Sequence, residues 1–169
     1  MAYIPCNTKN YTVGRSMPIE YIVIHYTANN GDTAIGNCNY FANNKVGASA
    51  HYFVDENGYV QSIPEKDTAW HCGGGLQGTG GHTFYKKCMN SNSIGIELCS
   101  RKNCKGNYYF KEQTLKNTAA LVRDIMKRRN IPIERVIRHY DVTGKICPAP
   151  LIDETEWKKF KQMIMLIII

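Results

Sequence analysis

The stretch Tyr21-Ile-Val-Ile-His-Tyr-Thr27 is an unbroken run of β-branched and aromatic side chains. Such a run predicts a central β-strand, because these side chains pack well on the pleated surface of a sheet. Successive side chains of a strand point to opposite faces, so His25 shares a face with Val23 and Thr27 near the strand's end. A lone histidine in that position is more often a hydrogen-bonded structural residue than a ligand. Histidine and cysteine residues further along the chain reverse that balance.

A second stretch, Arg138-His-Tyr-Asp-Val-Thr-Gly-Lys-Ile-Cys-Pro148, holds residues that suit a metal site. We expect a short strand that ends at His139, followed by an extended segment from which Lys145 and Cys147 project to one side. With His25, this stretch supplies two nitrogen ligands and one sulfur ligand. Three such ligands suit zinc with one coordination position open, which is typical of a catalytic rather than a structural site.

A zinc-stabilised structural domain is the competing interpretation of the same residues. It needs a fourth protein ligand, and the nearest candidate is His51, inside a predicted strand over residues 50–54. We interpret His51 mainly as a structural residue, because the other three residues already complete a ligand set.

The segment Asn92-Ser-Ile-Gly-Ile-Glu-Leu-Cys99 predicts another buried strand, and it contains a carboxylate. A charge inside so apolar a strand is costly unless it is paired or used. Gly95 leaves space on the face of the strand that Glu97 shares. Glu97 is therefore either part of a structural ion pair or a general base whose pKa is raised by burial.

Thr68-Ala-Trp-His-Cys-Gly73 opens a glycine-rich loop that lacks the pattern of a phosphate-binding P-loop. Glycines in such a loop favour a mobile wall beside a binding groove. In that wall, Trp70 would offer an apolar face to a sugar ring and His71 a hydrogen bond to a peptide carbonyl. A surface loop with a packed tryptophan fits the sequence equally well.

The remaining segments predict one hairpin and three helices around these strands. A polar turn ending in Asn57-Gly58 joins strands at residues 50–54 and 59–63. The basic cluster Lys127-Arg128-Arg129 suits the negative C-terminal end of a helix, and we interpret it as a solvated capping face. The predicted helices cover residues 33–44, 112–129 and 154–165.

Length and charge place limits on the class of protein. A chain of 169 residues that is 43% hydrophobic fits one globular domain, with a core over about 20–150 and a closing helix over about 154–165. The formal net charge of +7 favours anionic partners such as an acidic cell wall. Because no DNA- or RNA-binding signature accompanies that charge, we do not expect nucleic acid as a partner.

The ends of the chain and its cysteines suggest neither secretion nor membrane insertion. The start shows no secretion signal, and the apolar run Met163–Ile169 is far shorter than the ~20 residues that a membrane helix needs. We interpret that run as the buried end of a last helix or the edge of a longer chain. The seven cysteines include no C-x-x-C pair, and we expect reduced thiols, with any pairing left open.

Five motifs in order resemble the zinc-dependent N-acetylmuramoyl-L-alanine amidases of the amidase-2 type, a family shared with phage endolysins and peptidoglycan recognition proteins. The resemblance covers roughly residues 20–150. The motifs are Val23-Ile-His-Tyr-Thr-Ala28, Ser49-Ala-His-Tyr-Phe-Val-Asp55, Ala69-Trp-His-Cys-Gly73, Asn92-Ser-Ile-Gly-Ile-Glu97 and His139 with Lys145-Ile-Cys-Pro148.

The resemblance implies an α/β fold with a central mixed β-sheet flanked by helices and zinc in a groove on the sheet. It implies that His25, His139 and Cys147 bind the zinc, that Glu97 is the catalytic glutamate and that Lys145 stabilises the oxyanion. We also expect substrate contacts from three further motif residues. These are Trp70, His71 and Asn92.

One position departs from part of the family. Some members carry a catalytic tyrosine just before the histidine of the hairpin strand, where this chain has Ala50. Tyr52 lies two places later and does not inherit that role. The departure favours the subgroup in which the glutamate carries the proton.

The activity that the resemblance implies is hydrolysis of the amide between N-acetylmuramic acid and L-alanine in peptidoglycan. We expect the catalytic domain of an endolysin, a monomer that stays in the host cytoplasm until release and then acts on the cell wall. A bacterial autolysin or a recycling amidase is the alternative within the class, although Cys147 in place of aspartate disfavours recycling. A non-catalytic peptidoglycan-binding module is the alternative outside it, and the complete ligand set disfavours that reading.

Overall fold

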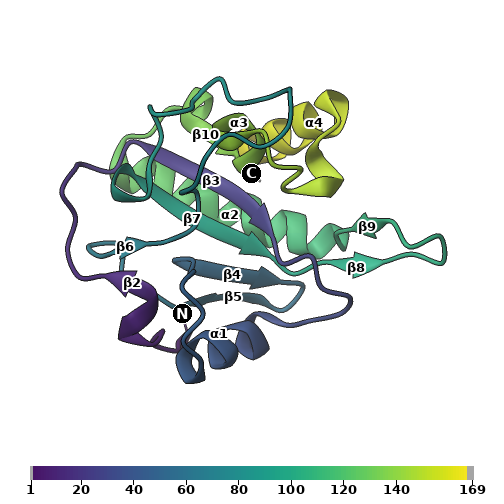
Figure 1. Cartoon of the computed structure of the whole chain (residues 1–169). Helices are drawn as coiled ribbons and strands as arrows, with labels where there is room; N and C mark the ends of the chain where they lie inside the picture. The colour runs from purple at the N-terminus through teal and green to yellow at the C-terminus, as the bar shows by residue number, and fades with distance from the viewer. Residues whose placement is uncertain (1, 167–169) are drawn as a thin grey trace.

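A six-stranded mixed sheet forms the centre of the protein in the computed structural model, which describes residues 2–166 (Figure 1). The strand order is β1-β5-β4-β7-β3-β10, and neighbouring strands are parallel except for the β4–β5 hairpin. The expected mixed sheet is therefore confirmed. Its strands are β1 (Ala2–Tyr3), β3 (Tyr21–Tyr26), β4 (Tyr52–Asp55), β5 (Gly58–Gln61), β7 (Ser93–Leu98) and β10 (Val136–Arg138).

Short elements complete the chain between these strands. Two small antiparallel pairs lie outside the main sheet: β2 (Tyr11–Thr12) with β6 (Thr68–Ala69), and β8 (Arg101–Lys102) with β9 (Tyr108–Tyr109). The 3-10 turns are η1 (Thr8–Asn10), η2 (Asn90–Asn92), η3 (Ile133–Arg135) and η4 (Ala149–Leu151). None of these short pairs or turns was predicted.

Helices α2 (Glu112–Arg129) and α4 (Glu154–Met165) cover one face of the sheet, and α2 runs behind β3 and β7 in Figure 1. The alternation of apolar residues in β3 and β7 supplies the sheet side of this core, as predicted. The buried side of α2 is wide, because the helix packs on both the sheet and α4. Leu121 and Ile125 are buried in addition to Ala119 and Val122.

The opposite face carries α1 (Ala34–Asn43) and α3 (His139–Thr143). Helix α1 begins as predicted, because the Thr33 hydroxyl accepts a hydrogen bond from the N–H of Gly36. Helix α3 was not predicted. The strand before it stops at Arg138, whose N–H donates to the carboxylate of Asp141 at 2.8 Å and so turns the chain into a helix at His139.

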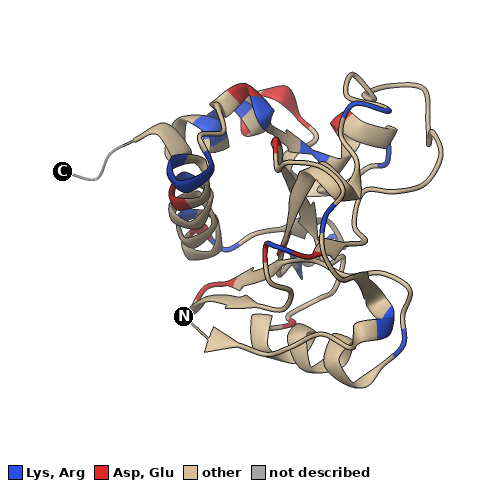
Figure 2. Cartoon of the chain, turned by 90° about the vertical axis from the view of Figure 1, so that its left-hand side faces the viewer, with Lys and Arg blue, Asp and Glu red and all other residues tan. Residues whose placement is uncertain are grey.

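Charge, cysteines and the C-terminal segment follow simple patterns. Acidic and basic residues are interspersed along α2 and α4 (Figure 2). Among residues 2–166 all seven cysteines are free thiols, and no helix is long and apolar enough to cross a membrane. Of the apolar run at residues 163–169, Ile164 is buried against the core, and 167–169 lie outside the described residues.

Candidate active site

The site lies at the carboxyl ends of three adjacent parallel strands. His25 near the end of β3 is in register with Glu97 of β7, and His139 follows β10 directly. Crevices at the carboxyl ends of parallel strands are where ligands bind in open α/β sheets. The topology thus brings together residues that are far apart in the sequence.

His25, His139 and Cys147 form a compact group of candidate ligands. One ligand atom from each lies within 4.8 Å of the others, and all three residues are buried. The Sγ atom of Cys147 is 3.7 Å from Nδ1 of His25. The predicted convergence of these three residues is therefore confirmed.

The electrostatics of the group suit a cation. Burial, with smaller effects of neighbouring charges, lowers the pKa of His25 well below its ordinary value and that of His139 to about 4. Both imidazoles are therefore neutral at pH 7, which is the form that binds a metal. Burial raises the pKa of the Cys147 thiol to about 12, and a metal ligand must be a thiolate, so binding a cation here would release a proton.

The ring of His139 gives an independent indication of a missing partner. Both of its nitrogens are buried and make no hydrogen bond within residues 2–166. Unpaired buried polar atoms are costly and uncommon in folded proteins. A metal bound beside His25 and Cys147 would satisfy one of the two.

A network around Arg138 holds the segment from His139 to Cys147 in place. The buried guanidinium donates to Asp141 at 2.8 Å, to Glu154 at 2.6 Å and to the carbonyl oxygen of Leu151 at 3.1 Å. It thereby joins β10, α3 and the start of α4. The N–H of Tyr140 donates to the carbonyl oxygen of Cys147 at 2.8 Å, which fixes the cysteine beside the helix.

Glu97 and Lys145 face the same groove of about 860 Å³ as the three ligands. The Glu97 side chain is partly exposed, but its Oε2 is buried and has no hydrogen-bond partner among the described residues. Burial raises its pKa to about 8, against the opposing effect of the Lys145 charge. Glu97 forms no salt bridge within residues 2–166. Its surroundings therefore favour the general-base interpretation over a structural ion pair.

His51 and Tyr52 take no part in the ligand group. Nδ1 of His51 accepts from the N–H of Gly95 at 3.0 Å, and its Nε2 is 3.2 Å from the carbonyl oxygen of Asp67. The Tyr52 hydroxyl points away from the groove and donates to Glu65 at 2.8 Å. These contacts favour the structural interpretation of His51 and leave Tyr52 outside the site, and Ala50 lies in the groove wall without a side chain that could move a proton.

The three expected substrate-binding residues have different outcomes. Trp70 lines the groove, with its indole N–H donating to the hydroxyl of Thr12 at 3.0 Å. His71 also lines it, but Nδ1 is 3.0 Å from Nε2 of His25 and Nε2 is 3.1 Å from Oγ of Ser93. With both nitrogens engaged inside the protein, the expected hydrogen bond to a substrate carbonyl does not fit this ring.

Asn92 is not in the groove. Its buried side chain accepts from the N–H of Met89 at 2.7 Å and donates to the carbonyl oxygen of Lys87 at 2.9 Å. Those bonds close the turn before β7, so this asparagine shapes the loop rather than presenting an amide to substrate.

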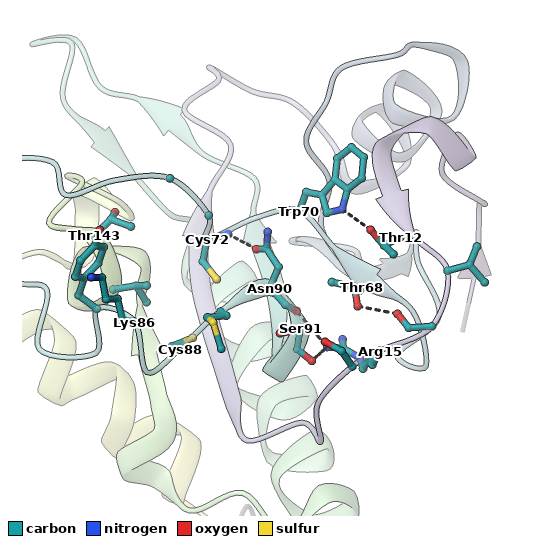
Figure 3. Close-up of a pocket in the computed structure, with 18 residues that line it drawn as sticks. Thr12, Arg15, Thr68, Trp70, Cys72, Lys86, Cys88, Asn90, Ser91 and Thr143 are labelled. Carbon is teal, nitrogen blue, oxygen red and sulfur yellow. Dashed lines mark hydrogen bonds between the residues drawn. The ribbon is translucent and has the colours of Figure 1, made fainter.

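A second pocket of about 810 Å³ shares Trp70 with the groove (Figure 3). Arg15, Lys86 and the buried thiols of Cys72 and Cys88 are among its lining residues. Part of the glycine-rich loop forms its wall. The rest of the loop lies against α3, where the N–H of Gln77 donates to the carbonyl oxygen of Thr143 at 2.6 Å.

Sequence reasoning did not identify Arg138 or Ser93 as part of the site. A buried arginine is unusual, and its position directly before His139 was the available signal. The role of Ser93 depends on the ring of His71, which only the folded chain brings near it.

Comparison with known proteins finds similarity over most of the chain. Residues 15–150 match the family model described as N-acetylmuramoyl-L-alanine amidase. The chain is 36% identical over 148 residues to N-acetylmuramoyl-L-alanine amidase CwlA of Bacillus subtilis strain 168, covering 88% of this chain and 50% of that protein. It therefore spans about half the length of that curated relative.

Two solved structures are similar over nearly the whole chain. A mutant endolysin from Bacillus subtilis has a TM-score of 0.75 at 29% identity, covering 96% of this chain and 97% of that one. The catalytic domain of XlyA has a TM-score of 0.75 at 28% identity, covering 97% of this chain and 99% of that one.

Proposed function

The chain belongs to the N-acetylmuramoyl-L-alanine amidase family, and from that premise we propose that it uses zinc to hydrolyse the amide between N-acetylmuramic acid and L-alanine in peptidoglycan. The convergence of a buried His, His, Cys group with Glu97 and Lys145 in one groove carries this proposal. A module that only binds peptidoglycan would need neither the unpaired carboxylate of Glu97 nor the ammonium group of Lys145 in the same groove.

The zinc would be held by His25, His139 and Cys147. Two imidazole nitrogens and one sulfur suit a site that keeps its fourth position open for water or substrate. When bound, zinc supplies Lewis-acid chemistry, by activating water and polarising a carbonyl. The unpartnered nitrogens of His139 support this assignment.

Glu97 is the residue that moves the proton. Its Oε2 has no hydrogen-bond partner within residues 2–166 and is free to accept a proton from the attacking water and deliver it to the leaving amine of L-alanine. A pKa of about 8 in the metal-free groove gives the carboxylate a higher proton affinity than an ordinary glutamate. A bound cation would lower that value toward neutrality by charge attraction.

Lys145 stabilises charge on the substrate. Its ammonium lies in the wall of the groove near Glu97 and His139, whose pKa values both respond to it. A positive charge there would interact with the carbonyl oxygen as negative charge develops on it. Removing such a group typically lowers kcat by about 10²–10³.

The biological setting that fits best is the catalytic part of an endolysin acting on the cell wall. The similarity to a Bacillus subtilis endolysin supports this setting, and the net charge of +7 suits an anionic wall. We also propose a monomeric enzyme, because the five site residues form the groove without a residue from a second copy.

Mass spectrometry of purified peptidoglycan digested by the zinc-loaded protein tests the proposal. New free L-alanine amino termini that are absent after chelation would support it. Binding to the wall without new termini would indicate a recognition module instead. New reducing sugars, or cuts within the stem peptide, would mean that the assigned bond is wrong.

A further inference from the structure

His71 lies directly against a proposed metal ligand, although the mechanism above does not use it. Its ring and that of His25 are nearly perpendicular, with centroids 5.1 Å apart, and Nδ1 of His71 is 3.0 Å from Nε2 of His25. On its other side, Nε2 of His71 is 3.1 Å from Oγ of Ser93. The three side chains therefore form a continuous hydrogen-bonded row.

The direction of each hydrogen bond among Ser93, His71 and His25 follows from the bond that the Ser93 hydroxyl donates. The Ser93 hydroxyl donates to the carbonyl oxygen of Met89 at 2.6 Å, because a carbonyl oxygen can only accept. A hydroxyl has one proton, so Oγ of Ser93 must accept from His71. The proton of a neutral His71 is then on Nε2, and its Nδ1 carries a lone pair.

The same reasoning passes from His71 to His25. Nδ1 of His71 can only accept, so Nε2 of His25 carries the proton and donates to it. Nδ1 of His25 is left with its lone pair, and that atom is the one 3.7 Å from Sγ of Cys147. A metal binds the nitrogen that carries no proton.

We propose that His71, oriented by Ser93, is a positioning residue that fixes the tautomer of His25 and so presents the Nδ1 lone pair to the metal. The inference rests on the proposed function in that the metal is zinc. On this proposal His71 contacts the metal-binding residue His25 instead of the substrate. A hydrogen-bond partner on the second nitrogen of a histidine ligand orients the ring and raises its basicity.

The surrounding chain is built to hold this ring. A Cβ atom on Gly95 would lie 2.5 Å from Cγ of His71, so only glycine leaves room for the imidazole at that position of β7. The backbone N–H groups of His71 and Cys72 both donate to Oδ1 of Asn90, at 3.0 and 2.9 Å. The adjoining elements η2 and β7 thus hold the backbone of His71 and leave room for its ring.

The other proposed histidine ligand has no such support. Neither nitrogen of His139 has a hydrogen-bond partner within residues 2–166, so no protein group selects its tautomer. His25 is therefore the ligand that is organised before the metal arrives. The tautomers of His25 and His139 can therefore be compared within one protein.

Nuclear magnetic resonance of the zinc-free wild-type protein tests the tautomer without any variant. Two-bond ¹H–¹⁵N spectra of the imidazoles distinguish a proton on Nε2 from one on Nδ1. We expect His25 to carry its proton on Nε2 as a single tautomer. A His25 ring protonated mainly on Nδ1 would overturn the inference.

Two substitutions test the consequence for zinc binding. His71→Asn places a carbonyl oxygen near the position of Nδ1 and keeps an acceptor for His25, whereas His71→Leu removes it. By competition with a chelator, we expect the leucine variant to bind zinc about 10- to 100-fold more weakly and the asparagine variant to stay close to wild type. His82→Asn, in the same loop but outside the row, is the matched control and should not change the affinity.

Equal zinc affinity in wild type and a folded His71→Leu variant would overturn the inference, as would an asparagine variant as weak as the leucine variant. Failure of the proposed function gives a different result. A wild-type protein that binds no zinc would refute the zinc enzyme, while the imidazole spectrum would still decide the tautomer of His25.

Discussion

Two carboxylates inside this fold, Glu65 and Glu97, have opposite surroundings. Glu65 accepts hydrogen bonds from the Tyr52 hydroxyl at 2.8 Å, from Arg128 at 2.9 and 3.1 Å and from Arg129 at 2.6 and 2.9 Å. Glu97 lies at the end of β7 with one buried oxygen that has no partner among the described residues. The first is a closed ion-pair network, and the second is an open site.

Their pKa values differ for the same reason. Burial alone would raise the pKa of Glu65, but the hydrogen bonds from Arg128, Arg129 and Tyr52 outweigh it and lower the value to about 2. Burial raises the pKa of Glu97 to about 8, because only the Lys145 charge opposes it and no hydrogen bond to Oε2 from the described residues does. A buried carboxylate with all its partners stabilises the fold, whereas one without partners is available for chemistry.

The contrast extends from these residues to their regions. Six buried side-chain atoms within residues 2–166 have no hydrogen-bond partner, and four belong to residues that line the groove. Those four are Oε2 of Glu97, both ring nitrogens of His139 and Oδ1 of Asp32. The groove therefore holds most of the unsatisfied polar atoms of the described residues, as a preformed site for a cation and a substrate would.

Glu97→Gln gives the largest expected effect, and it should fall on activity alone. The amide cannot accept a proton, so we expect kcat on peptidoglycan to fall by about 10²–10⁴. Thermal unfolding should show equal or higher stability, since the substitution removes a buried ionisable group whose Oε2 has no hydrogen-bond partner among the described residues. An unchanged cleavage rate would remove Glu97 from its assigned role.

Glu65→Gln should give the converse result. Removing one partner of a buried ion pair leaves Arg128 and Arg129 without their carboxylate, and we expect a loss of about 3 kcal/mol in the free energy of unfolding. Denaturant titration measures that loss, and the activity per folded molecule should stay at the wild-type level. A fall in kcat with unchanged stability would contradict the division between the two carboxylates.

The two glutamates should also give opposite dependences of stability on pH in the zinc-free protein. Glu65 has a lowered pKa, so its contribution of about 2–3 kcal/mol is present above its ordinary pKa of 4.5 and is lost as the pH falls toward about 2. Glu97 has a raised pKa, so its contribution is present below pH 4.5 and is lost as the pH rises through about 8.

Denaturant titrations of wild type and the two glutamine variants across this pH range separate these contributions. The difference between wild type and Glu65→Gln should shrink on acidification below pH 4.5. The difference between Glu97→Gln and wild type should grow from pH 4.5 to 8. Parallel curves for all three proteins would contradict both assignments.

The smallest effect is expected at an exposed carboxylate. Asp153 caps α4 by accepting from the N–H groups of Thr155 at 2.9 Å and Glu156 at 3.2 Å. Asp153→Ala should lower the melting temperature by about 2–4 °C and leave kcat unchanged. Asp124→Ala, on the exposed side of α2, is a control that removes a surface ion pair without a cap.

The sequence allowed much of the site to be predicted, because its residues follow regular patterns. Alternation along β3 and β7 placed His25 and Glu97 on one face, and parallel strands end side by side. The motif around Lys145 and Cys147 supplied the rest. The predicted extended segment there is instead a turn, in which the N–H of Cys147 donates to the carbonyl oxygen of Lys145 at 2.7 Å.

The contacts that were not predicted involve partners distant in the sequence. The basic cluster at the end of α2 is exposed, as predicted, but Arg128 and Arg129 also bind Glu65, a residue in a polar turn that gave no sign of burial. The ring contacts of His71 with Ser93 and His25 were not predicted, because these residues become its neighbours only when β3 and β7 pair. Helix periodicity and strand alternation do not show which side chains from distant parts of the sequence will be in contact.

X-ray absorption at the zinc edge of the metal-loaded protein tests the central claim most directly. The account predicts one zinc per chain with one sulfur at about 2.3 Å and nitrogen or oxygen ligands at about 2.0–2.1 Å. The sulfur signal should disappear in Cys147→Ser and persist in Cys72→Ser, whose thiol lies in the neighbouring pocket. A zinc without sulfur in its shell, or a sulfur signal that survives in Cys147→Ser, would contradict the account.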